Sequence, residues 1–406
     1  MADGGVGGGA RLGRRAVGLA GLAVAGVGAG GGLPGRARAA ECLGRDCVIR
    51  HALVTGSNSG IGLAAAQRLA ADGHAVMLAC RTRAKAEAAA EAVVRAVPAA
   101  AGRLTPLECD LASLESVRKC AATVAAAAAP IDLLCLNAGA QFTGRPEAPL
   151  TAEGLELTWG ANHLGHFLLA YLLAPQLAEA GRRGDGSGSA RVIVTASEVH
   201  DPESAGGAVG APATLGGLEG LERAAARTAA GGRPEFEMVD GGPWDGEKAY
   251  KDSKLCNVLF TREFQRRLSA AGGGDAVTVN AFGPGLITES NFFQNNPSQN
   301  RAAVAIFALA ADRVLRVTET ADGGGRCLEY MALSPELEGR GGLYYNNTLE
   351  GLPLSPRHAF AEDPGSEESR RPAEAARLWD LSAALAGVAP DLPPLAPPPP
   401  SETAAV

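Results

Sequence analysis

A tyrosine and a lysine four residues apart are the side chains of this chain best suited to chemistry. Tyr250 and Lys254 lie in the sequence AYKDSKLCN. Residues four apart share one face of a helix, so the Lys254 ammonium can lie near the Tyr250 phenol and favour its ionised form. A free phenol has a pKa of about 10, so this assistance would suit proton transfer near neutral pH. The pair predicts an acid–base device, although the same spacing is also common on ordinary helix faces.

A glycine-rich segment far upstream has the layout of a nucleotide loop. The apolar run His51–Val54 leads into TGSNSGIG, and an alanine-rich helical pattern follows from Leu63 to Ala71. The glycines would allow a tight turn and a close approach of the backbone to a pyrophosphate, while the helix N-terminus would offer free N–H groups. The cofactor-binding residues expected here are Gly56, Ser57, Asn58, Ser59, Gly60, Ile61 and Gly62.

The ends of the next three expected strands add to this nucleotide site. Arg81 and Lys85 follow the run 75–79, where a site for NAD would more often have an acidic residue. Their positive charge predicts a 2′-phosphate and therefore NADPH. The other expected cofactor contacts are Asp110 and Leu111 after the run 104–109, and Asn137, Ala138 and Gly139 after the run 131–136.

These motifs, in this order, resemble the short-chain dehydrogenase/reductase superfamily over about residues 48–350. The resemblance implies an α/β fold of Rossmann type, a doubly wound, mostly parallel sheet with helices on both faces. It implies that Tyr250 donates the proton and that Lys254 holds the nicotinamide ribose. It further implies that Ser197 orients the substrate, that Asn162 anchors a water in a proton relay, and that Pro284 and Gly285 border the nicotinamide.

An insertion of residues 198–249 separates Ser197 from Tyr250, where most members of the superfamily have a short connection. With the segment MVDGGPWDGEKAY, which ends at Tyr250, and NHLGHFLL, which begins at Asn162, the insertion makes the chain similar to the light-dependent protochlorophyllide oxidoreductases. This resemblance implies that NADPH delivers a hydride to the C17–C18 double bond of protochlorophyllide, that Tyr250 or a relayed water supplies the proton, and that light drives the step. It implies no metal held by the protein, because the magnesium belongs to the pigment.

Two other activities remain open at the level of the sequence. One is a light-independent, NADP-dependent carbonyl or retinoid-type reductase of a lipophilic substrate, and the other is a non-catalytic NADPH-binding regulator. That family typically has a cysteine directly after the Pro-Gly pair, whereas this chain has Leu286, which cannot donate a proton but can pack against a flat apolar ring. Phe292 and Phe293 follow in a segment that we expect to close over the substrate. The expected substrate pocket is therefore Leu286, Phe292 and Phe293.

Composition limits the remaining classes of function. A net charge of −7 over 406 residues gives no reason to expect binding to nucleic acid. The eight cysteines form no Cys-x-x-Cys pair, so neither a zinc site nor a disulfide framework is expected. His163 and His166 lie three apart on an expected helix, but they have no third ligand nearby in the sequence, so we expect packing rather than metal binding.

The two ends of the chain differ from its centre. Residues 1–45 are rich in Gly, Ala and Arg, with an apolar run from Ala16 to Gly32 and an Ala-x-Ala site at Ala37, which predicts a cleavable plastid targeting segment or, alternatively, a secretory signal. We expect a reductase domain at residues 46–388 and a proline-rich disordered tail at residues 389–406. Any association with plastid or thylakoid membranes is expected to be peripheral, and an oligomer is among the states that the sequence leaves open.

Overall fold

A single eight-stranded sheet organises the computed structural model, which describes residues 48–127, 130–287, 318–352 and 355–395. The strand order is β3-β2-β1-β4-β5-β6-β7-β8, and every neighbouring pair is parallel except β7 and β8. The order reverses between β1 and β4, which is the switch point where ligands bind in doubly wound sheets. This confirms the predicted fold class.

The strands are β1 (His51–Thr55), β2 (Ala75–Cys80), β3 (Leu104–Glu108), β4 (Leu133–Leu136), β5 (Ala190–Thr195), β6 (Val277–Gly283), β7 (Tyr344–Leu352) and β8 (Ser355–Asp363). The α-helices are α1 (Gly60–Ala71), α2 (Arg83–Ala96), α3 (Leu114–Ala126), α4 (Leu157–Trp159), α5 (Gly165–Gly181), α6 (Glu219–Ala229), α7 (Gly246–Ala270), α9 (Ala321–Leu333) and α10 (Pro372–Ala386). A π-helical turn, η2 (Gly160–Leu164), joins α4 to α5. The 3₁₀ turns are η1 (Pro98–Ala100), η3 (Glu198–His200), η6 (Pro335–Leu337) and η7 (Glu368–Arg370).

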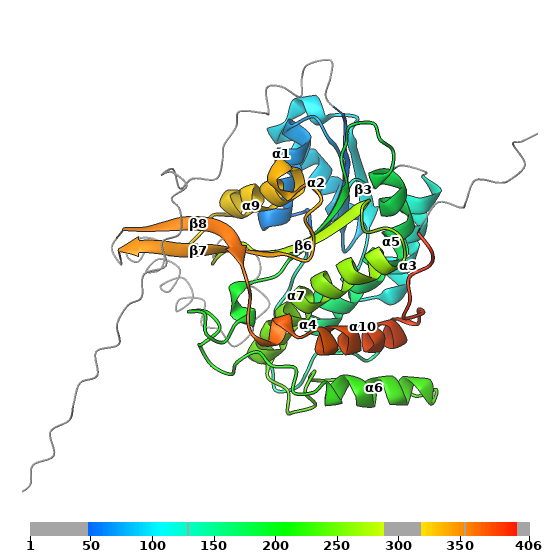
Figure 1. Cartoon of the computed structure of the whole chain (residues 1–406), viewed down its shortest axis with the longest axis vertical. Coiled ribbons are helices and arrows are strands. Elements are labelled where there is room, and N and C mark those ends of the chain that lie inside the picture. Colours follow the sequence, from blue (N-terminus) through cyan, green and yellow to red (C-terminus); the bar gives the residue numbers. More distant parts are fainter. Residues whose placement is uncertain (1–47, 128–129, 288–317, 353–354, 396–406) are drawn as a thin grey trace, which may run out of the picture. The chain divides into compact units, whose positions relative to one another are not determined.

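Successive residues of the central strands face two separate apolar cores, because side chains alternate across a strand. In β1, Leu53 belongs to one core, whereas Ala52 and Val54 belong to the other. Helices α3, α5, α7 and α10 contribute to the first core, and α1, α2 and α9 contribute to the second (Figure 1). Burial on both faces explains why these strands are almost continuously apolar in sequence.

The insertion between Ser197 and Tyr250 contains η3, helix α6 and long connections. Its apolar side chains Leu215, Leu218 and Leu221 are fully buried and join the core beneath α7 and α10. Helix α6 packs against α10 (Figure 1). Glu222 forms an ion pair with Arg377 across the two helices. The insertion is therefore part of the folded domain.

The chain after α10 differs from the predicted disordered tail over its first residues. Leu392 and Leu395 are 8% and 5% exposed, and the Leu395 N–H donates to the Ala271 carbonyl at 2.8 Å. The prolines do not prevent this packing, because the intervening leucines bury apolar surface against the domain. The expected targeting segment lies outside the described residues. Among the residues that the structure describes, no helix is long and apolar enough to cross a bilayer.

Candidate active site

The glycine loop between β1 and α1 has the geometry of a phosphate cradle. Gly56 has φ +68°, and a Cβ there would lie 2.9 Å from the Ala138 Cα. A Cβ at Gly62 would lie 2.4 Å from the Gly56 carbonyl oxygen, so the loop closes only with glycine at both positions. The N-cap residue Ser59 makes no side-chain cap to α1, which leaves the first-turn N–H groups available for an anion. These residues fit a dinucleotide pyrophosphate.

Thr55, at the end of β1, connects this loop to the next strand ends. Its Oγ1 accepts the N–H groups of Asn137 at 2.9 Å and Ala138 at 3.0 Å. His166 lies 2.9 Å from the same oxygen through Nε2, while its Nδ1 donates to the Asn162 carbonyl at 3.0 Å. Burial lowers the pKa of His166 to about 4, so the ring is neutral and Nε2 accepts from the Thr55 hydroxyl. Sequence reasoning missed Thr55 as this junction.

The residues expected at the adenine end of the cofactor lie together along one pocket. Arg81 and Lys85 are exposed beyond the end of β2, and Asp110 and Leu111 follow β3. All four line the same pocket as the glycine loop. The Asp110 carboxylate accepts from the Ala112 N–H at 3.1 Å, which fixes the turn after β3. Two cations thus line the pocket beyond the end of β2, and their contact with a 2′-phosphate stays a prediction.

Tyr250 and Lys254 lie on the first turns of α7, which begins where the Asp245 side chain accepts from the N–H groups of Glu247 and Lys248. The Lys254 Nζ lies 5.5 Å from the centroid of the Tyr250 ring and donates to the Thr195 carbonyl at 2.9 Å. A side-chain hydrogen bond also joins Tyr250 to Ser197, which follows β5. The structure thus brings the three predicted catalytic side chains together at the carboxyl ends of the strands.

The electrostatics of this pair differ from the sequence-based expectation. Burial raises the pKa of the Tyr250 phenol, and the hydrogen bond with Ser197 offsets only part of that rise. Burial also lowers the pKa of Lys254 to about 8. The expectation that Lys254 favours the ionised phenol is not met, because the ammonium is directed to Thr195 and burial outweighs any charge effect. Tyr250 therefore holds its proton, as a proton donor requires.

Asn162 lies in the π-helical turn η2 and is fully buried. Its Oδ1 accepts from the Ala140 N–H at 2.8 Å, and its Nδ2 donates to the Ala140 carbonyl at 2.9 Å and to the Ser253 hydroxyl at 3.0 Å. These bonds tie the loop after β4 to helix α7. Single π-helical turns are frequent at functional sites. The anchoring of a water by Asn162 stays a prediction.

Most of the predicted site residues line one pocket of about 1350 Å³. Small-molecule pockets commonly have about 300–1,000 Å³, so this volume suits two ligands side by side. The predicted residues that line it are Gly56, Asn58, Ser59, Gly60, Ile61, Arg81, Lys85, Asp110, Leu111, Asn137, Ala138, Gly139, Asn162, Ser197, Tyr250, Lys254, Pro284, Gly285 and Leu286. Ser57 and Gly62 are buried behind the loop, and Phe292 and Phe293 lie outside the described residues.

Strand β7 adds pocket residues that sequence reasoning missed. Asn347 donates from Nδ2 to the Pro284 carbonyl at 3.1 Å, which holds the Pro-Gly turn. Tyr344 is 1% exposed, and its hydroxyl donates to the Asn346 side chain at 3.2 Å. These polar residues are buried by a strand pairing remote in sequence, so no local pattern identified them.

The histidine pair on η2 and α5 has separate partners. His163 Nε2 lies 3.0 Å from the Ser382 hydroxyl on α10, whereas His166 bonds to Thr55 and Asn162. Both rings are buried in the packed interior. Among the described residues, no group of three His, Cys, Asp or Glu side chains could hold a metal ion.

Comparison with known proteins agrees with this arrangement. Residues 50–231 match the family model described as short chain dehydrogenase. The chain is 34% identical to a chloroplastic protochlorophyllide reductase of Marchantia paleacea, over 83% of this chain and 68% of that protein. It is 36% identical to a protochlorophyllide reductase of Avena sativa, over 83% of this chain and 99% of that protein.

Solved structures show the same fold. An uncharacterised protein from Mycobacterium paratuberculosis has a TM-score of 0.56 and 28% identity, covering 85% of this chain and 95% of its own. A short-chain type dehydrogenase/reductase from Mycobacterium marinum, at 19% identity, has a TM-score of 0.50 and covers 73% of this chain and 93% of its own. With the sequence relatives, these likenesses establish that the chain belongs to the short-chain dehydrogenase/reductase superfamily and, within it, to the protochlorophyllide reductase family.

Proposed function

We propose that this protein reduces protochlorophyllide to chlorophyllide with NADPH, in a light-driven step inside the plastid. One observation carries the proposal: a single large pocket joins the nucleotide loop to Tyr250, Lys254 and Ser197 and leaves room for a second, bulky ligand. The names of the relatives support both the substrate and the plastid location.

NADPH, when bound, supplies a hydride to one carbon of the pigment double bond and leaves as NADP⁺. The glycine loop and the N-terminus of α1 hold the pyrophosphate, because these residues line the pocket and Ser59 does not cap the helix, so its first N–H groups can bind an anion. Arg81 and Lys85 hold the 2′-phosphate, which NADH lacks. Lys254 holds the ribose next to the nicotinamide.

Tyr250 supplies the proton to the second carbon, so the double bond becomes a single bond. Its raised pKa keeps the phenol protonated until it reacts, and Ser197 orients it through their hydrogen bond. Lys254, with a pKa of about 8, is suited to returning a proton near neutral pH. Leu286 packs against the pigment ring and takes no part in proton transfer, so this chain relies on Tyr250 for the proton.

The test uses the full chain mixed in darkness with NADPH and protochlorophyllide, then illuminated while the pigment absorbance is followed. A red shift to chlorophyllide that requires both light and NADPH is expected. A dark control and a sample with NADH separate photochemistry and cofactor choice from simple binding. Pigment binding without conversion would refute the proposed reaction, and an absence of pigment binding would refute the proposed substrate as well.

A second candidate function is favoured by the hydrogen bond between Ser197 and Tyr250. Two adjacent hydroxyls suit the binding of one carbonyl oxygen, which a light-independent reductase of lipophilic ketones or aldehydes would require. Oxidation of NADPH in darkness with a retinoid-type aldehyde, without any pigment conversion in light, would select this activity.

A further inference from the structure

The inserted segment after β5 forms one wall of the pocket and presents an apolar side chain at its mouth. Glu203, Gly206 and Val209 all line the pocket from this segment. Val209 is 67% exposed, and Leu349 on β7 is 41% exposed and also lines the pocket. Four large apolar side chains are this exposed in the described part of the chain, and two of them border this one pocket. Their shared location points to an apolar ligand.

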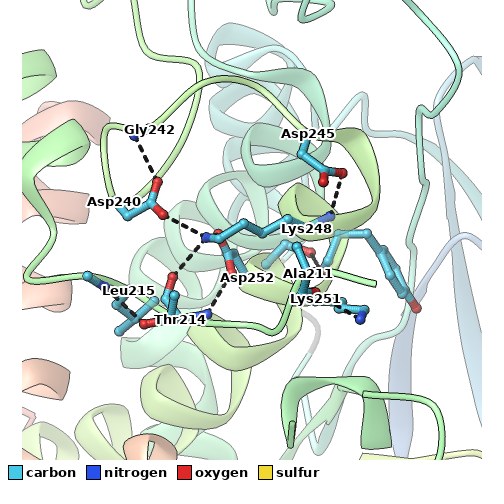
Figure 2. A network of polar contacts seen from close by, with 12 residues as sticks. Ala211, Thr214, Leu215, Asp240, Gly242, Asp245, Lys248, Lys251 and Asp252 are labelled. Atoms are coloured by element: carbon cyan, nitrogen blue, oxygen red, sulfur yellow. Dashed lines mark hydrogen bonds and ion pairs between the residues drawn. The ribbon is translucent and has the colours of Figure 1, made fainter. Parts of the chain in front are cut away.

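Lys251, next to Tyr250 on α7, holds this wall in place. Its Nζ donates to the carbonyls of Gly207 at 2.9 Å and Ala211 at 3.0 Å, and also to the carbonyl of Val209. An ammonium has three donors, so all of them are used on this one segment. Lys251 is 6% exposed, which makes the bonds stronger than they would be in water. Figure 2 shows Lys251 beside Ala211 on the insertion.

A neighbouring charge network fixes the later part of the insertion to the same helix. The Lys248 Nζ lies 2.6 Å from the Asp252 carboxylate and 2.9 Å from the Asp240 carboxylate. Asp252 in turn accepts from the Thr214 N–H at 3.0 Å (Figure 2). Thr214 is therefore held by Asp252 and does not depend on Lys251. Among these charged groups, Lys251 alone holds the part of the wall that carries Val209.

We propose that Lys251 is a positioning residue for the substrate and that Val209 is a specificity-determining residue. Lys251 donates to the carbonyl of Val209 and to the carbonyls of Gly207 and Ala211, two residues to either side. These bonds keep the valine side chain at the mouth, where it contacts the apolar ring system of a large flat substrate. Lys251 does not touch the reacting atoms, because its ammonium is occupied by the wall. The identity of the substrate rests on the proposed function.

The experiment compares four single variants of the full chain with the wild type. Lys251→Met keeps the apolar stem and removes the ammonium, Lys251→Arg keeps the charge and donors, and Val209→Thr keeps the shape and adds a hydroxyl. Lys119→Met, at an exposed lysine on α3, is the matched control for loss of a charge. The readouts are kcat and KM for protochlorophyllide, the Kd for NADPH, and amide hydrogen exchange of residues 203–213.

Displacement of the valine in Lys251→Met, or a hydroxyl in place of one of its methyl groups in Val209→Thr, should raise KM for the pigment about tenfold. The kcat and the NADPH Kd should stay within about twofold, because the contact is made equally before and during the reaction. Exchange of residues 203–213 should accelerate in Lys251→Met but not in Val209→Thr. Lys251→Arg should restore most of the pigment affinity, and Lys119→Met should match the wild type.

Three results would overturn the inference: an unchanged KM in Lys251→Met, a fall in kcat without a rise in KM, or unaltered exchange of residues 203–213. An unchanged KM in Val209→Thr would remove the role of the valine even if Lys251→Met fails to fold. If the wild type binds no pigment, the proposed function fails, and the exchange measurement still decides whether Lys251 holds the wall.

Discussion

Substituting Lys254 by methionine should change the pH dependence of stability, because it removes a charge that the fold buries at a cost. Lys254 is 3% exposed, and burial lowers its pKa from 10.5 to about 8. The unfolded chain therefore binds the proton more tightly than the folded chain does. Between about pH 8 and 10.5 the unfolded state carries more protons, so the free energy of unfolding of the wild type rises with pH in this window.

The magnitude follows from the difference between the two pKa values. Each pKa unit corresponds to about 1.4 kcal/mol, so the wild type should gain about 2–3 kcal/mol from this group between pH 7 and pH 10. The methionine variant has no such gain. It also loses the hydrogen bond to the Thr195 carbonyl, but that loss shifts its stability by the same amount at every pH. The difference in unfolding free energy, variant minus wild type, should therefore fall by about 2–3 kcal/mol from pH 7 to pH 10.

Urea unfolding of both proteins at pH 7, 8, 9 and 10 measures this difference, with the m-value checked for constancy. Titration of the other lysines and tyrosines is common to both proteins and cancels. Lys254→Arg keeps its charge at every pH tested. Its unfolding free energy should therefore differ from that of the methionine variant by the same amount at pH 7 and at pH 10. If the difference in unfolding free energy between the methionine variant and the wild type stays constant with pH, the conclusion that burial lowers the pKa of Lys254 is wrong.

Three further substitutions test the roles proposed for the site. Tyr250→Phe should lower kcat by about 10²–10⁴-fold and leave the NADPH Kd nearly unchanged, and full turnover would exclude Tyr250 as the proton donor. Arg81→Glu should raise the Kd for NADPH about tenfold or more while affecting NADH much less, measured by fluorescence titration. Equal losses for both cofactors would place Arg81 away from the 2′-phosphate. Leu286→Cys should change turnover by less than about threefold, and a large gain would identify position 286 as a missing proton donor.

The central fold could be predicted from sequence because its strands are buried on both faces and are read as apolar runs. The ends of the runs at 75–79, 104–109 and 131–136 also carry the polar residues expected at the cofactor site. The resemblance to the short-chain dehydrogenase/reductase superfamily added the mostly parallel direction, and the strand order came from the structure. The β7–β8 pair could not be predicted in the same way. Its buried Asn346 and Asn347 look like loop residues until they pair with Tyr344 and Pro284.

Spacing identified Tyr250 and Lys254 as candidate catalytic residues, and the family resemblance added Ser197 and Asn162, whereas the electrostatics of these residues came only from the fold. A Tyr-x-x-x-Lys spacing places both side chains on one face of a helix. The spacing does not predict that the Lys254 ammonium donates to the Thr195 carbonyl, or that burial raises the pKa of Tyr250. Lys251 illustrates the same limit. In sequence it is an ordinary charged helical residue, and only the folded insertion brings three carbonyls to it.

Helix α7 therefore connects the chemistry to the choice of substrate. Tyr250 and Lys254 meet the nucleotide side of the pocket, while Lys248, Lys251 and Asp252, between or beside them in sequence, hold the inserted wall. Because residues on different faces of one rigid helix contact the two regions, the wall can vary in sequence without disturbing the proton donor, provided that its carbonyls still reach Lys251. Substitution of Lys251 should accordingly raise KM, whereas substitution of Tyr250 should lower kcat.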